Sequence, residues 1–402
     1  MGSSNHGNTV LAGNPQSYGA PKEFHPGRVL TFRTPEGRTN LALELAYFAM
    51  LALLTYSVSL LIVVAHKDFW GLVWNSGDNH GYIQIAQGIR EWNPQVIGKV
   101  KLFWGTSYGI LAVASLIRAD YGTSLLLLSV FCGALSVFFA HRLYGGAVAA
   151  WFVFVSAALI QRILTGGPEP IFVALFLGAL FAIRRGHAGW AVFLGALAAT
   201  VKPIGVFVLG AILFTSLRRK DWRNLIYYGA VAACVAVLYG APLVLLTGSP
   251  FGNFSGYAGD WHQKVLPITI PFYPIVKDAI TSQAPLTNSI KNATWIAAVV
   301  LVIAYYGLMR GRLRAHFAQC PEETVAVLLV IFFQLSYNST WAWAEFPRFI
   351  IPVVPFLLAQ AGVERFRRSV PLVAAPVFGL LGAVQIVGFQ SLLHSFRSLI
   401  RL

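Results

Sequence analysis

Long apolar runs recur along this chain from residue 41 to residue 390, and they limit its fold more than any other feature. A membrane-spanning helix needs roughly 20 apolar residues, and runs near that length are separated here by short polar breaks. Of the 402 residues, 56% are hydrophobic and 11% are charged, which leaves too few polar side chains to cover a water-soluble globule. We therefore expect an all-α, polytopic integral membrane protein.

The two ends of the chain differ from this pattern. Residues 1–40 are rich in Ser, Gly, Asn and Pro and show no apolar periodicity, so we expect a disordered cytoplasmic tail there. No basic start followed by an apolar run precedes Leu41, which favours a retained first span over a cleaved signal peptide. We expect a single transmembrane domain over residues 41–390 and a C-terminal tail over residues 391–402.

Basic residues give the chain a net charge of +15, and many of them gather in clusters between the apolar runs. We interpret these clusters as signals of membrane topology and expect no nucleic-acid partner. Such clusters lie on the cytoplasmic side, so an even number of crossings should separate each cluster from the next. The clusters are Arg28/Arg33/Arg38, His141/Arg142, Arg184/Arg185, Arg218/Arg219/Lys220/Arg223, Arg310/Arg312/Arg314 and Arg365/Arg367/Arg368.

Between the first two clusters the chain has three apolar runs, although parity allows two crossings. The middle run, Leu102–Ile117, is the shortest, is broken by glycines and carries aromatic residues that favour interfaces. We therefore predict an interfacial helix there. Residues 66–122 then form one long outer loop with interfacial helices, and residues 247–294 form a second outer loop.

This topology predicts about eleven membrane crossings, with the N-terminus in the cytoplasm and the C-terminus outside. The predicted spans are Leu41–Ala65, Thr123–Ala140, Gly145–Ile160, Pro170–Ile183, Ala188–Thr200, Ile204–Leu217, Leu225–Leu246, Trp295–Leu308, Thr324–Thr340, Phe349–Gly362 and Val370–Gln390.

Two acidic residues fall on the predicted outer side, where polar residues next to a membrane are candidates for function. Asp78 follows the first span. Its carboxylate could remove a proton from an acceptor hydroxyl as a general base, or it could cap the following helix. Glu169 follows Gly166-Gly167-Pro168 and could bind substrate, or it could be a carboxylate at a helix start.

Cations also lie at predicted outer ends of spans. Lys202, Arg348 and, less directly, His262 could hold a phosphate through charge-assisted hydrogen bonds. The alternative is that each side chain extends to ordinary lipid headgroups. Glu345 stands three residues before Arg348 and could bind substrate or simply pair with that arginine.

Sequence motifs for other chemistries are missing from the chain. It contains no GxxxxGK[ST], HExxH, paired CxxC or GxSxG pattern, which disfavours ATP hydrolysis and zinc catalysis. We expect no dedicated metal ligands.

Four segments together resemble the GT-C superfamily of membrane glycosyltransferases, most closely the GPI second-mannosyltransferase-like family and its bacterial relatives. Asp78 to Ala86 reads D-N-H-G-Y-I-Q-I-A, similar to the first-loop pattern of that family, although Trp74 stands four residues before the aspartate. The segments Pro168–Phe172, Ala198–Gly205 and Glu345–Phe356 resemble its T-E-x-L-F, A-x-x-T-R-x-x-G and S-x-P-R-Y-x-L-x-x-F-P patterns. Lys202 replaces the usual arginine.

This resemblance implies a GT-C-type helical bundle and an inverting transfer of a sugar, a mannose-like hexose or a pentose, from a polyprenyl-phosphate donor. The acceptor would be a glycan, lipid or protein at the outer or lumenal face of a bacterial inner membrane or the endoplasmic reticulum. Asp78 would be the base, and Lys202 and Arg348 would contact the phosphate. Tyr82, Glu169, His262 and Glu345 would bind substrate. Some members of the superfamily use a divalent cation, so such an ion is a possible cofactor.

Two other interpretations stay open on the sequence alone. Short, proline-broken spans with a few charges also suit a membrane transporter or lipid flippase. A non-catalytic subunit of a glycosylation complex would share the same motifs. Against a transporter, the chain shows no repeated half-pattern, and its candidate charges fall on one predicted side.

Overall fold

The computed structural model describes residues 41–65, 69–75, 78–97, 102–250, 268–273, 307, 309–337, 346–367 and 369–387, and this part of the chain is helical, with no β-strand. The first half contains α1 (Leu41–Ala65), α2 (Phe69–Asn75), α3 (Asn79–Arg90), α4 (Pro94–Ile97), α5 (Gly105–Ile117), α6 (Tyr121–Tyr144), α7 (Gly146–Val155), α8 (Ala157–Thr165), α9 (Pro168–Arg184) and α10 (Ala188–Val201). The second half contains α11 (Val206–Arg218), α12 (Trp222–Thr247), α16 (Pro321–Ser336), α18 (Phe346–Ile350), α19 (Val354–Ala361) and α20 (Ser369–Val387). Short 3₁₀ turns occupy Pro203–Gly205, Ile351–Val353 and Val363–Arg365.

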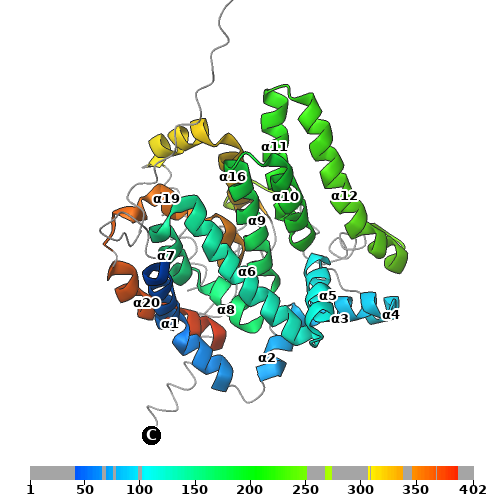
Figure 1. The fold of residues 1–402 in the computed structure, drawn as a ribbon, viewed down its shortest axis with the longest axis horizontal. Helices are drawn as coiled ribbons and strands as arrows, with labels where there is room; N and C mark the ends of the chain where they lie inside the picture. The colour runs from blue at the N-terminus through cyan, green and yellow to red at the C-terminus, as the bar shows by residue number, and fades with distance from the viewer. Residues whose placement is uncertain are drawn as a thin grey trace, which may run out of the picture.

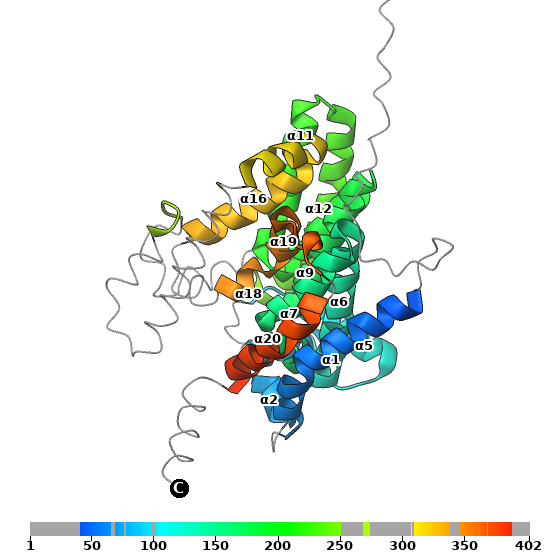
Figure 2. The same cartoon turned by 90° about the vertical axis from the view of Figure 1, so that its left-hand side faces the viewer.

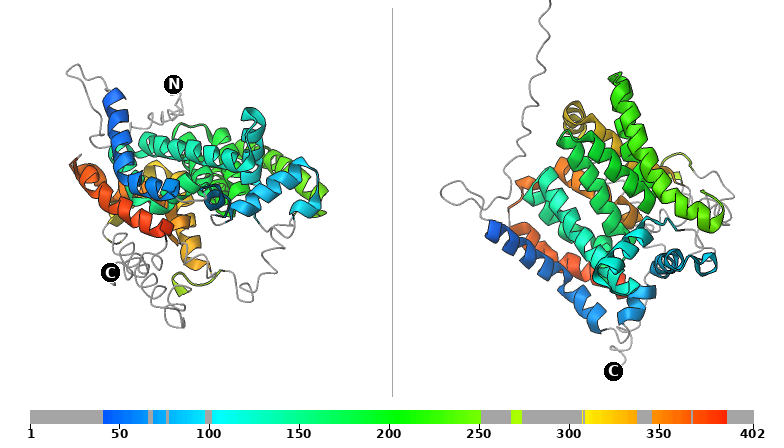
Figure 3. Two further views of the ribbon diagram at one scale, coloured as in Figure 1. Left: turned by 90° about the horizontal axis from the view of Figure 1, so that it is seen from below. Right: turned by 45° about the vertical axis from the view of Figure 1, so that its right-hand side comes forward.

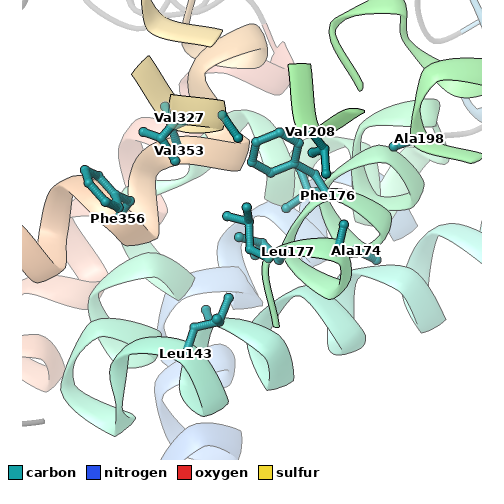
Figure 4. Close-up of a cluster of buried hydrophobic side chains, with 14 of the residues drawn as sticks. Leu143, Ala174, Phe176, Leu177, Ala198, Val208, Val327, Val353 and Phe356 are labelled. Atoms are coloured by element: carbon teal, nitrogen blue, oxygen red, sulfur yellow. The ribbon is translucent and has the colours of Figure 1, made fainter. Parts of the chain in front are cut away.

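Helix α9 forms the centre of the bundle and packs against α6 on one side and α10 on the other (Figure 1). Its side chains are apolar around almost the whole helix, as expected of a helix buried on all sides. Phe176 and Leu177 are fully buried there and meet Leu143 of α6, Val208 of α11 and Val353 in one hydrophobic cluster (Figure 4). Helices α16 and α18 extend to one side of α9 (Figure 2). This core fixes the position of both ends of α9.

The helices nearest the two ends of the described chain pack against each other. Helices α1 and α20 run side by side along one flank of the bundle (Figure 3). They approach so closely that a Cβ at Gly379 would lie 2.4 Å from the carbonyl oxygen of Thr55. The absence of a side chain at this glycine therefore permits the contact.

Helices α2 to α5 gather at one end of the bundle, below α9 and α10 in Figure 1. They belong to the predicted outer loop 66–122. Helix α5 has 13 residues, and three residues separate it from α6, whose start is capped by Asp120 accepting a hydrogen bond from the Thr123 amide at 2.9 Å. The prediction of a short helix separate from the following span is therefore confirmed, while its position at a membrane interface stays a prediction.

The number of membrane crossings is not confirmed. By length and composition, two helices of the described residues can cross a membrane, α6 and α12, and a third is possible if α7 and α8 count as one bent span. Helices α9, α10 and α11 have 17, 14 and 13 residues, fewer than the roughly 20 that span a hydrocarbon core. The count of about eleven crossings stays a prediction.

The predicted span Gly145–Ile160 is wrong as a single helix. The chain bends by 75° near Ser156 between α7 and α8, and helix continues to Thr165, beyond the end of the predicted span. The backbone at Ser156 leaves the helical region, with φ −96° and ψ 56°. The bend carries Arg162 of α8 to the first turn of α9, where it meets a carboxylate described below.

Several predictions fall outside the described residues. They are the disordered tail 1–40, most of the second outer loop 247–294, the span Trp295–Leu308, the site residues His262 and Glu345, and the C-terminal tail 391–402.

Candidate active site

Glu169 lies in the first turn of α9, and its position is fixed by the turn that precedes it. The Ser129 hydroxyl of α6 accepts a hydrogen bond from the Gly167 amide at 3.0 Å. Asn79, the first residue of α3, donates its side-chain N–H to the Thr165 carbonyl at 2.9 Å. Two other helices therefore hold the start of α9, and the Glu169 side chain is 1% exposed.

Lys202 reaches the same carboxylate from the C-terminal end of α10. Its ammonium donates a hydrogen bond to Oε1 of Glu169 at 2.8 Å and lies 4.5 Å from the centre of the Phe349 ring, close enough for a cation–π interaction. Pro203 follows and begins a 3₁₀ turn. The predicted break between two helices at this residue is confirmed, and it releases the lysine toward Glu169.

The contact between α5 and α10 supports this lysine from behind. A Cβ at Gly105 would lie 2.3 Å from Oγ1 of Thr200 and 2.6 Å from the carbonyl carbon of Thr200. Any larger residue at Gly105 would push apart the first turn of α5 and the last turn of α10. The end of α10, which carries Lys202, is therefore held by a helix of the first outer loop.

Arg348 joins the two predicted acidic residues. It lies in the short helix α18, donates a hydrogen bond from Nε to Oε1 of Glu169, and places a terminal nitrogen 3.5 Å from Oδ2 of Asp78. The Asp78 side chain is 48% exposed and the Arg348 side chain 13%. A half-exposed carboxylate at the rim is thus connected through one arginine to a buried carboxylate.

The geometry argues against the alternative roles of Asp78 as a helix cap and of Lys202 and Arg348 as contacts for lipid headgroups. Asp78 precedes α3, yet within the described residues its side chain accepts no capping hydrogen bond from that helix. Lys202 and Arg348 pair with Glu169 inside the protein, so extension to lipid headgroups is not their role in this structure. Tyr82 is buried, one turn beyond Asp78, and lies near enough to Arg348 to interact with it electrostatically.

Arg162 is a member of this cluster that the sequence analysis missed. Its Nε lies 3.6 Å from Oε2 of Glu169, and its side chain is 9% exposed. The signal was available, because Arg162 is the one basic residue between the cluster at Arg142 and the cluster at Arg184. Arg162 falls between the predicted spans Gly145–Ile160 and Pro170–Ile183, where the sequence does not indicate a partner for it.

The electrostatics of the cluster are dominated by its cations. Three of them surround one buried carboxylate, and opposite charges this close favour the ionised form of that carboxylate. Burial, together with the neighbouring charges of Arg348 and Arg162, lowers the pKa of Lys202 to about 8 against the opposing effect of Glu169. An additional anion at this site would raise the pKa of Lys202 again, because it favours the charged form of the lysine.

A second polar cluster lies at the other end of α9, on the order of 22 Å away along the helix. His316, Cys320 and Glu323 form the one group of possible metal ligands in the described residues, within 4.8 Å of one another. Arg184 donates to both oxygens of Glu323, and the Tyr144 hydroxyl donates to Oε1 at 2.7 Å. We interpret this cluster as a buried ion pair that joins helices α6, α9 and α16. A divalent cofactor stays a prediction.

Two solved structures of one protein are similar to this chain, and the first supports a shared fold. The apo form of ArnT from Cupriavidus metallidurans matches with a TM-score of 0.52 and 15% identity, over 87% of this chain and 66% of that protein. ArnT from the same organism bound to undecaprenyl phosphate matches with a TM-score of 0.45 and 14% identity, over 81% of this chain and 60% of that protein. The chain therefore spans slightly less than two thirds of the length of ArnT. At this level of identity the likeness concerns the fold.

Sequence comparison identifies the family. No protein with curated annotation matches the chain. The sequence profile of glycosyltransferase family 87 matches residues 102–337, more than half of the chain and a region that includes Arg162, Glu169 and Lys202. Together with the apolar helices and the ArnT-like fold, this match shows that the chain belongs to glycosyltransferase family 87 and is an integral membrane protein with a GT-C-type fold.

Proposed function

We propose that this protein transfers a sugar from a polyprenyl-phosphate donor to an acceptor hydroxyl, with inversion at the anomeric carbon. The observation that carries the proposal is the connection of half-exposed Asp78, through Arg348, to Glu169 and Lys202. It places a candidate base beside candidate ligands for a phosphate. ArnT has undecaprenyl phosphate bound in one structure, so a donor of this chemical class is the first to test.

In the proposed reaction Asp78 accepts the proton of the acceptor hydroxyl as its oxygen attacks the anomeric carbon. The bond between that carbon and the phosphate oxygen breaks, and its electron pair stays on the phosphate. The donor phosphate carries one negative charge before the reaction and two afterwards. Lys202 and Arg348 stabilise this added charge, which develops in the transition state.

Arg348 takes part in both deprotonation of the acceptor and departure of the phosphate. Its contact with Asp78 weakens when Asp78 takes up a proton, because the carboxylate then loses its charge. The freed positive charge of Arg348 becomes available to the leaving phosphate at the same moment. Glu169 has the role of orienting Lys202 and Arg348, since its buried carboxylate contacts both of them.

The sugar is a mannose-like hexose or a pentose in this proposal, and the acceptor is a glycan, lipid or protein. The reaction takes place at the periplasmic or lumenal face of a bacterial inner membrane or the endoplasmic reticulum. Support for this orientation comes from two basic clusters. Arg184 lies at the opposite end of α9 from Glu169, and Arg218 lies at the end of α11 that is farther along the chain from Lys202.

The test is a transfer assay with purified protein in lipid nanodiscs, using a panel of polyprenyl-phosphate sugars and the matching nucleotide sugars. We expect transfer from one or more polyprenyl-phosphate sugars and an inverted anomeric configuration by NMR. Transfer from nucleotide sugars alone, or retention of configuration, would contradict the proposal. Movement of intact lipid-linked sugar between leaflets without transfer would favour the flippase.

A further inference from the structure

Phe349 lies inside the candidate site and has no assigned role in the reaction. It follows Arg348 in α18, and the centre of its ring lies 4.5 Å from the Lys202 ammonium nitrogen. The Arg348 guanidinium carbon lies 6.0 Å from the same ring centre, at the outer limit of a cation–π interaction. The ring therefore interacts mainly with Lys202.

The charges around Lys202 show what a neutral ring adds there. The ammonium donates a hydrogen bond to Oε1 of Glu169, and Nε of Arg348 donates to the same oxygen. Because they share one oxygen, these two cations lie close together and repel each other. Arg162 approaches the other oxygen of Glu169. Arg348 and Arg162 both disfavour the charged form of the lysine, and Glu169 favours it.

A ring and a carboxylate hold a cation in different ways. An aromatic ring attracts a cation through its quadrupole and carries no net charge. A second carboxylate beside Lys202 would also hold the ammonium, but it would neutralise it and weaken its attraction for a phosphate. The Phe349 ring holds the ammonium and leaves its positive charge available to an anion.

We propose that Phe349 is a positioning residue, whose ring face holds the Lys202 ammonium in place at the end of α10. Consecutive residues of α18 then contact both members of the buried ion pair, since Arg348 contacts Glu169 and Phe349 contacts Lys202. The contact between ring and ammonium is independent of the reaction. Its consequence for the donor phosphate rests on the proposed function.

The first experiment weakens the electrostatic attraction of the ring and keeps its shape. In the full-length protein, Phe349 is replaced by phenylalanine analogues with one, two or three fluorine atoms, which reduce the negative potential of the ring face step by step. At about pH 7 we expect the Tm of the ligand-free protein in detergent to fall with each fluorine, by about 1–3 °C over the series. Well above the Lys202 pKa of about 8, this dependence should disappear, because the amine is then neutral.

Two controls identify the cause of any change in Tm. The same analogues at Phe207, whose ring centre lies 5.4 Å from that of Phe333, report the effect of fluorine on the packing of a ring against another ring. That effect should be equal at both pH values. In Lys202→Met, fluorination of Phe349 should leave Tm unchanged at about pH 7. A Tm in the wild-type background that ignores fluorination of Phe349, or that depends on it equally at both pH values, would overturn the proposal.

The second experiment measures the consequence for phosphate binding. The ligand is farnesyl phosphate, and its affinity is measured by calorimetry in detergent at about pH 7.5, above its second pKa of about 6. We expect the affinity to fall about fivefold from Phe349 to the trifluoro analogue. The pH at which binding begins to weaken should also move down, because the ring no longer favours the charged lysine. An affinity that stays constant while Tm falls would refute the role of Phe349 in donor binding.

The outcomes separate this inference from the proposed function. A graded decrease in Tm without transfer from any polyprenyl-phosphate sugar supports the contact between Phe349 and Lys202 and refutes the proposed function. Transfer from such a sugar, together with a Tm that ignores fluorination, leaves the function intact and refutes the role of Phe349.

Discussion

Arg348 donates a hydrogen bond to Glu169 across 179 residues of sequence, from a five-residue helix to the first turn of the central helix α9. The same arginine contacts Asp78, which lies in neither element. Three distant segments that carry the family-like motifs therefore meet at one arginine. Their meeting in space, more than any single motif, supports a shared chemical role.

Glu169→Gln should destabilise the protein strongly. The substitution leaves Arg162, Lys202 and Arg348 buried around a neutral amide, and breaking a buried ion pair by removing one partner costs roughly 3–5 kcal/mol. Thermal unfolding in detergent should show a clear decrease in Tm. Glu322→Gln is the matched control, because Glu322 pairs with the exposed Arg219 and such pairs contribute less than about 1 kcal/mol. Equal Tm values for the two variants would contradict the account.

Donor binding should weaken at alkaline pH. The pKa of Lys202 is lowered to about 8 by burial, so the residue loses its positive charge as the pH rises through that value, and the attraction for a phosphate falls with it. We expect the KM for the donor to rise above this pH. In Lys202→Arg the rise should be flatter, since a guanidinium stays protonated. A KM profile that is the same in both proteins would show that Lys202 does not contact the donor.

Gly105→Ala should disturb the site from a distance. The new methyl group would lie 2.3 Å from Oγ1 of Thr200 and should force α5 away from α10, at a cost of roughly 1–3 kcal/mol. Because Lys202 follows that end of α10, the KM for the donor should increase as well. Gly229→Ala is the control, since among the described residues no atom outside the adjoining turns of its own helix lies within 4 Å of its Cβ position, and in a helix it should be neutral or stabilising. Equal effects of the two substitutions would refute the close contact.

Much of the site could be predicted from the sequence because its residues interrupt apolar runs. Asp78, Glu169, Lys202 and Arg348 stand at polar breaks between apolar runs, and the parity of the basic clusters predicts that those breaks lie on one side of the membrane. What the sequence does not reveal is how the four residues pair. The role of Arg348 as a bridge depends on the packing of α18 against α8 and α16, which no local pattern encodes.

Other features could not be predicted because nothing local marks them. The bend between α7 and α8 falls at Ser156 within an apolar stretch that has no Gly or Pro. The pairing of Arg162 with Glu169 depends on that bend. Because the sequence does not indicate the bend, it does not indicate the pairing either. By contrast, the helix α1 has the predicted bounds, Leu41–Ala65, because they coincide with a sharp change between polar and apolar residues.

Asp78→Asn tests the central claim most directly. The asparagine keeps the size of the side chain and removes its ability to accept a proton, and general base catalysis contributes about 10²–10⁴-fold to rate. Transfer from a polyprenyl-phosphate sugar should therefore fall by about 10²–10⁴-fold in kcat, while the affinity for farnesyl phosphate stays equal to or above that of the wild type, since a negative charge beside Arg348 is lost. Transfer by Asp78→Asn at the wild-type rate would contradict the assignment of Asp78 as the base.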